Sequence, residues 1–109
     1  MKVGETSGQP GQPINPNKEM VEAARNFRQY LDDYNNTRDN SVKKHDMDKM
    51  VREMHLMDDL SKFVDRKETR NIEQKVSKDF SIYHQNPSKE NYNVLEHDLN
   101  VLRESLEHW

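Results

Sequence analysis

Histidines that lie three or four residues from a carboxylate are the side chains best suited to metal binding or acid–base chemistry. His45 precedes Asp48 by three residues, and His55 precedes Asp58 by the same interval. His108 follows a glutamate by four residues. Such pairs share one face of a helix and supply two ligands. Two ligands do not complete a metal site, and the chain lacks the His-Glu-x-x-His and paired Glu-x-x-His motifs. We therefore expect exposed histidines and neither metal nor cofactor.

The chain also lacks the motifs of nucleophilic catalysis and of phosphate binding. It contains no cysteine, and no serine lies in a Gly-x-Ser-x-Gly sequence. All three glycines lie within the first 11 residues, so no glycine-rich loop leads from a strand to a helix. Adjacent carboxylates such as Asp32 and Asp33 point to different faces of a helix. We predict that the protein is not an enzyme.

Basic residues concentrate in one stretch, which is the candidate for contact with nucleic acid. They are Arg66, Lys67, Arg70, Lys75 and Lys78.

Residues 65–84 nevertheless hold four acidic residues beside these five basic ones, and the whole chain has a net charge of -3. A nucleic-acid surface needs basic side chains gathered on one face without acidic neighbours. We interpret Glu68 and Glu73 as surface partners of the basic residues. A regulator that binds nucleic acid through residues 66–78 is therefore the alternative prediction, and not the first one.

Four methionines form the most distinctive pattern in the middle of the chain. Met47, Met50, Met54 and Met57 are spaced by three, four and three residues, which places them in one stripe along a helix. We interpret this stripe mainly as core that faces other helices. Because methionine also lines adaptable binding grooves, part of the stripe could instead stay open to a partner helix.

Two other segments carry stripes of the same period. In the first helix the spacings are four, three, four and three: Met20, Ala24, Phe27, Leu31 and Tyr34. In the last helix they are three, four, three, four and three: Tyr92, Leu95, Leu99, Leu102, Leu106 and Trp109. We expect the three stripes to meet. The candidate partner interface comprises Met47, Met50, Met54, Met57, Leu95, Leu99, Leu102, Leu106 and Trp109.

Turn and capping residues divide the chain into elements. Asn-Pro pairs at 15–16 and 86–87 favour helix starts, since proline fits the first turn. Residues 65–71 contain no apolar residue, so we place a bend there, and the alternative is one continuous helix over residues 42–84. Glycine, proline and glutamine at 1–14 predict a flexible tail. Residues 15–109 form a single domain in this interpretation, with helices at 16–35, 42–64, 71–84 and 88–108.

Composition limits how large a core the protein can build. Of its 109 residues 31% are hydrophobic and 34% are charged, and the mean hydropathy is -1.26. These values lie close to those of disordered chains, so the periodic stripes are what indicates a fold. We predict an all-α protein, a small antiparallel bundle of three or four helices. The alternative is a helical hairpin that forms a coiled-coil dimer.

These observations favour a function that depends on surfaces. We predict a non-enzymatic protein-binding module, such as a small adaptor, a chaperone-like protein or a regulatory protein. Its amphipathic helices would engage another protein or a second copy in a homo-oligomer. No apolar run approaches the ~20 residues of a transmembrane helix. The polar first 12 residues lack the apolar core of a signal peptide, so we expect a cytoplasmic protein without membrane contact.

Overall fold

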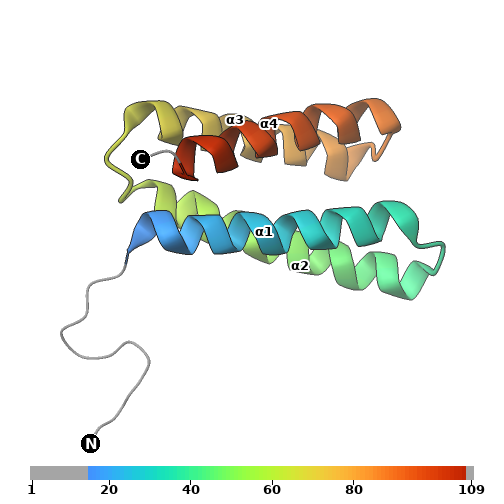
Figure 1. The fold of residues 1–109 in the computed structure, drawn as a ribbon. Coiled ribbons are helices and arrows are strands. Elements are labelled where there is room, and N and C mark those ends of the chain that lie inside the picture. Colours follow the sequence, from blue (N-terminus) through green and yellow to red (C-terminus); the bar gives the residue numbers. More distant parts are fainter. Residues whose placement is uncertain (1–14, 108–109) are drawn as a thin grey trace, which may run out of the picture.

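The protein folds into four antiparallel helices. A computed structural model describes residues 15–107, and its helices are α1 (Pro16–Asn36), α2 (Asn40–Ser61), α3 (Lys67–Gln85) and α4 (Lys89–Glu107). Two hairpins, α1–α2 and α3–α4, lie against each other (Figure 1). Each helix has two neighbours, because α1 also packs on α4 and α2 on α3. The predicted all-α antiparallel bundle is confirmed, with four helices.

Polar side chains fix where three of the helices begin. The Asn15 carboxamide oxygen accepts a hydrogen bond from the Lys18 amide at 3.2 Å. The Asp39 carboxylate accepts one from the Ser41 amide at 2.8 Å, so α2 begins two residues before the predicted position 42. The Ser88 hydroxyl accepts one at 3.1 Å from the third amide beyond it, at the start of α4. These bonds satisfy amides that a helix leaves unpaired at its first turn.

The turn between the hairpins covers residues 62–66, which is earlier than the polar stretch in which we placed the bend. Helix α2 ends at Ser61 and not at residue 64, and α3 begins at Lys67 and not at residue 71. Val64 is buried in this turn with 2% of its surface exposed, which anchors the linker to the core. Thr69 is fully buried and lies 2.6 Å from the Ser105 hydroxyl, so this polar turn of helix does contact α4.

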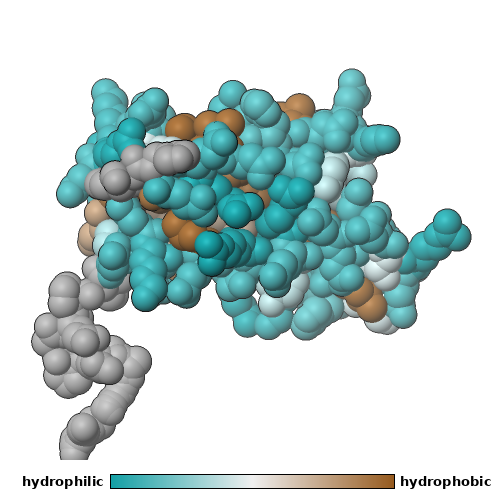
Figure 2. All heavy atoms as spheres, viewed as in Figure 1, coloured by the Kyte–Doolittle hydropathy of each residue, from teal (hydrophilic) through white to brown (hydrophobic). Residues whose placement is uncertain are grey.

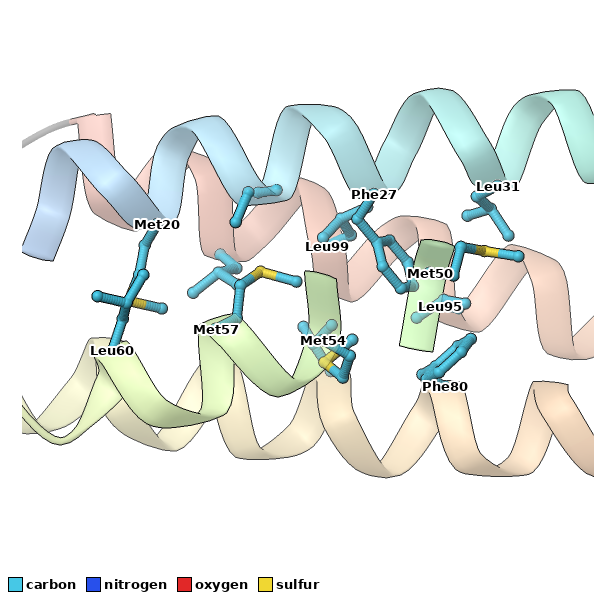
Figure 3. Close-up of a cluster of buried hydrophobic side chains, with 14 of the residues drawn as sticks. Met20, Phe27, Leu31, Met50, Met54, Met57, Leu60, Phe80, Leu95 and Leu99 are labelled. Carbon is cyan, nitrogen blue, oxygen red and sulfur yellow. The ribbon is translucent and has the colours of Figure 1, made fainter. Parts of the chain in front are cut away.

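The four apolar stripes meet along the axis of the bundle (Figure 3). Phe27 and Phe80 come from the diagonally opposed α1 and α3, and their rings meet edge to face with centroids 5.1 Å apart. The buried apolar residues are Met20, Ala23, Ala24, Phe27, Leu31, Met50, Met54, Met57, Leu60, Val64, Val76, Phe80, Tyr83, Leu95, Leu99, Leu102 and Leu106.

A polar network joins the hairpins where α1 meets α4. The Arg28 guanidinium donates hydrogen bonds to Asp32 at 3.2 Å, to Glu96 at 2.6 Å and to Asn100 at 3.1 Å. The Tyr92 hydroxyl donates to the same Asp32 carboxylate at 3.0 Å. Charge-assisted bonds of this kind are stronger than neutral ones. They fix the register of α4 against α1.

We expect Leu99→Ala to lower the free energy of unfolding by about 2–5 kcal/mol, because a fully buried leucine is removed and a cavity remains. Urea denaturation followed by circular dichroism measures the change. Val94→Ala on the same helix is the control, since Val94 is 50% exposed and its truncation should cost less than about 0.5 kcal/mol. Equal losses in both variants would contradict this arrangement of α4.

Candidate interaction face

The candidate interface residues on α2 and α4 lie in the core of the bundle. Most of them are buried: Met50, Met54, Met57, Leu95, Leu99, Leu102 and Leu106. Met47 is half-buried and packs against this core. Trp109 lies outside the described residues. In the closed bundle these side chains contact one another, so a partner could reach them only if the helices separated.

Two of the basic residues predicted for nucleic-acid contact are turned toward the chain itself. The Arg66 guanidinium donates to the Ser105 carbonyl at 3.4 Å, which connects the linker to α4. The Arg70 guanidinium donates to the Val64 carbonyl and so holds the turn against α3. These bonds give both arginines a structural role at the junction of the hairpins.

The other three basic residues point outward from α3. Lys67 and Lys78 are exposed. The Lys75 ammonium lies 3.7 Å from the Asp98 carboxylate on α4. The structure therefore does not gather the five basic side chains into one surface without acidic neighbours.

Helices α3 and α4 carry a second periodic stripe, which lies beside the core stripe and has four exposed residues and two buried aspartates among its nine members. On α3 its spacings are four, three, four and three: Glu68, Ile72, Lys75, Asp79 and Ile82. On α4 they are four, three and four: Val94, Asp98, Val101 and Ser105. We call these nine residues the outer α3–α4 face.

Contacts between the two helices show that the two halves of this face lie together. One shallow groove is lined by Ile72 of α3 and by Val101 and Ser105 of α4. Farther along, Asp79 lies within hydrogen-bonding reach of Asp98. Figure 2 shows apolar residues that reach the surface among a largely hydrophilic exterior.

Beyond the aspartate pair, Ile82 and Val94 extend the face toward the α3–α4 turn. Ile82 follows Asp79 by three residues and Val94 precedes Asp98 by four, so each lies on the same side of its helix as the aspartate. Their exposed fractions are 45% and 50%. The outer α3–α4 face thus has apolar side chains on both sides of a central acidic pair.

The central pair is two carboxyl groups buried against each other. Asp79 and Asp98 have exposed fractions of 9% and 6%, and each has one oxygen without a hydrogen-bond partner among the described residues. Burial, followed by the hydrogen bond and the charge of Asp98, raises the pKa of Asp79 to about 7, against the opposing charges of Lys75 and Lys78. Two close carboxylates cannot both ionise without cost, so the pair retains a proton to near neutral pH.

Similar pairs occur where the other consecutive helices meet. Between α1 and α2, burial and then the hydrogen bond and charge of Asp33 raise the pKa of Asp46 to about 6. Between α2 and α3, burial and then the hydrogen bond and charge of Asp58 raise the pKa of Glu73 to about 8.

Our sequence interpretation of Glu73 as a surface residue is wrong, because its exposed fraction is 1%. It occupies a core position on α3, four residues after Thr69 and three before Val76. That spacing was the signal that could have identified it. The preceding residue, Ile72, is only partly buried.

Of the histidines considered as metal ligands, His45 and His55 lie among the described residues and His108 lies outside them. His45 and His55 are exposed on α2. Within residues 15–107 there is no group of three or more histidine, aspartate or glutamate side chains arranged to hold a metal ion. None of the four helices described is long and apolar enough to cross a membrane.

Comparison of the chain with protein-family models, with curated proteins and with solved structures gives no match.

We expect Asp79→Asn to flatten the pH dependence of stability. The folded protein keeps the proton of Asp79 up to about pH 7, whereas the unfolded chain loses it near 3.8. The free energy of unfolding should therefore fall as pH rises between these values, by up to about 1.4 kcal/mol per pH unit for this proton. Asparagine binds no proton, so the contribution of the Asp79 proton to the slope disappears. Urea denaturation at pH 5, 6, 7 and 8 measures the slope, and an unchanged slope would contradict the pairing.

Proposed function

We propose that this protein is a non-enzymatic binding module that engages another protein through the outer α3–α4 face. The observation that carries the proposal is the second stripe on α3 and α4. A helix that needs only to complete the bundle requires one apolar stripe, and the core stripe already serves that purpose. Ile82 and Val94 remain about half exposed beside that stripe. Grouped apolar residues beside charged ones are typical of a docking surface.

The most suitable ligand for this face is an amphipathic helix. The two halves of the face follow the helical repeat and lie side by side along two antiparallel helices. A third helix placed along them would offer its own apolar residues at intervals of three and four to the groove at Ile72 and Val101. Binding would then extend the bundle by one helix.

The charge of α4 favours a basic partner over a second copy of this protein. Helix α4 holds five acidic and two basic residues. Two copies docked through this face would bring acidic α4 helices together around the aspartate pairs, and like charges oppose such a contact. A helix with lysine or arginine beside its apolar stripe would be attracted instead.

Among the functional classes that the sequence suggests, the geometry favours a regulatory or adaptor protein that presents a preformed surface. A partner of the methionine stripe would first have to open the core. Binding of nucleic acid through residues 66–78 is less favoured, because Arg66, Arg70 and Lys75 are engaged in contacts within the chain. We expect the interaction to occur in the cytoplasm.

We expect Ile82→Asp and Val94→Asp to weaken partner binding at least tenfold, since each places a charge among the apolar contacts of the face. Both side chains are partly exposed, so the variants should keep their helicity by circular dichroism. A photo-crosslinking amino acid at position 82 or 94, introduced in cells, captures the partner, and mass spectrometry identifies the crosslinked segment. Binding to a synthetic peptide of that segment is then measured by fluorescence anisotropy for the wild type and both variants.

The matched control is Leu56→Asp, because Leu56 is 43% exposed on α2, away from this face. It should leave peptide binding unchanged. A crosslinked segment without an amphipathic basic pattern, or an equal effect of all three variants, would contradict the proposal. A crosslink to a second copy would establish self-association instead. Salt-dependent binding of a DNA or RNA probe, lost in an Arg66/Lys67/Arg70→Ala variant, would favour the nucleic-acid alternative.

A further inference from the structure

The contact between the two hairpins contains a glutamate at a core position. Glu73 of α3 is the most buried carboxylate in the described chain, with an exposed fraction of 1%. Asp58 and Ser61 of α2 face it, and the Ser61 hydroxyl donates to the Asp58 carbonyl at 2.9 Å. One of its oxygens has no hydrogen-bond partner among residues 15–107. A buried carboxylate opposite another carboxylate is stable only if a proton is shared between them.

Carboxyl and hydroxyl groups surround Glu73, and the two histidines His55 and His84 line the groove on the Asp58 side of the pair. On α2 the groups that face Glu73 are Asp58 and Ser61. On α3 itself, Ser77 donates to the Asp58 carboxylate at 3.4 Å. On α4, the Ser105 hydroxyl is hydrogen-bonded to the Thr69 hydroxyl one turn before Glu73.

The same side of the bundle has a surface groove that reaches the methionine stripe. The groove lies between α2 and α3 and is lined by Met54, Asp58, Ser77 and Phe80, among others. Asp58 thus lies at the border between the groove and the buried pair. Separation of α2 from α3 at this point would widen the groove and expose Met54. It would also expose Met57, which directly precedes Asp58.

We propose that the Glu73–Asp58 pair is a proton-dependent switch between the two hairpins. With the shared proton in place, Glu73 donates a hydrogen bond to Asp58 and α2 packs on α3. Loss of the proton leaves two carboxylates facing each other with little access to water. Their repulsion separates α2 from α3 at this point, and the methionine stripe becomes accessible. The polar network between α1 and α4, centred on Arg28, still holds the hairpins together on the other side.

The range in which the switch operates follows from the environment of Glu73. Burial first, and then the hydrogen bond and charge of Asp58, raise the pKa of Glu73 from 4.5 to about 8, with the Ser61 hydrogen bond acting in the opposite direction. Since the folded-state pKa lies above the ordinary value, the closed state is fully favoured below about pH 4.5 and is lost as the pH rises through about 8.

Methionine oxidation measures the opening directly. The folded full-length protein is exposed to dilute hydrogen peroxide at pH 6 and at pH 9, and peptide mass spectrometry gives the oxidation rates of Met54 and Met57. A free methionine derivative in the same buffers corrects for the chemistry of the oxidant. We expect the rates to rise by up to about a hundredfold between these pH values, because the ionised fraction of a group with a pKa near 8 rises from about 1% at pH 6 to about 90% at pH 9.

In Glu73→Gln the amide donates a hydrogen bond as the protonated acid does, so this rise should disappear. Glu22→Gln, on the exposed face of α1, is the matched control and should keep the rise. If Glu73→Gln does not fold, Asp58→Asn removes the opposing charge and should also reduce the rise. A wild-type protein that is equally protected at both pH values would overturn the proposal, as would a full rise in Glu73→Gln. Carboxyl carbon NMR gives an independent check on the wild type, since titration of Glu73 below pH 5 would equally overturn it.

Discussion

The structure depends on the burial of four narrow apolar stripes against one another. Fewer than a third of the residues are hydrophobic, so no helix has apolar surface to spare for a wide contact. Each stripe covers one face of its helix, and only an arrangement in which all four faces point to a common axis removes them from water together. Antiparallel packing through short turns achieves this, and it brings Phe27 of α1 against Phe80 of α3 at the centre.

Because the core is thin, the borders between helices contain polar residues, and these determine much of the behaviour of the bundle. At the border of α1 with α4, a guanidinium nitrogen of Arg28 lies 2.6 Å from a carboxylate oxygen of Glu96. Because these charges are opposite, the contact stabilises the packed state near neutral pH. The three borders between consecutive helices instead have paired carboxyl groups, at Asp33–Asp46, Asp58–Glu73 and Asp79–Asp98. Replacement of such groups by apolar residues commonly stabilises a protein. At each of these borders the pair raises the pKa of one carboxyl group, at Asp46, Glu73 and Asp79.

The two hairpins also differ in the residues that they present to solvent. Helices α1 and α2 present mainly charged and polar residues to water, with Leu56 of α2 43% exposed, whereas the outer α3–α4 face combines Ile82 and Val94 with the aspartate pair beside them. The residues of the binding face and of the proton-dependent switch that we propose are distributed along the borders of α3, the helix that contacts α2 on one side and α4 on the other.

The sequence by itself determined the helical class and most of the core. The stripes of α1, α2 and α4 depend on a local repeat, so Phe27, Met54 and Leu99 could be assigned to the interior without knowledge of their partners. Capping residues likewise placed the start of α1, since the Asn15 carboxamide acts on an amide three residues away. The sequence interpretation missed that Glu73 is buried, because a glutamate in a polar helix resembles a surface residue, although its spacing of three from Val76 places it on the core face.

Only the tertiary structure decided which carboxyl groups meet. Asp58 lies 15 residues before Glu73, and Asp98 lies 19 residues after Asp79, on different helices in both cases. Their proximity depends on the position of the turn at residues 62–66 and on the rotation of each helix about its axis. A rotation is set by the packing of all four stripes at once, so no single stripe predicts it. For the same reason the outer α3–α4 face became visible only when the inner face of each helix was known.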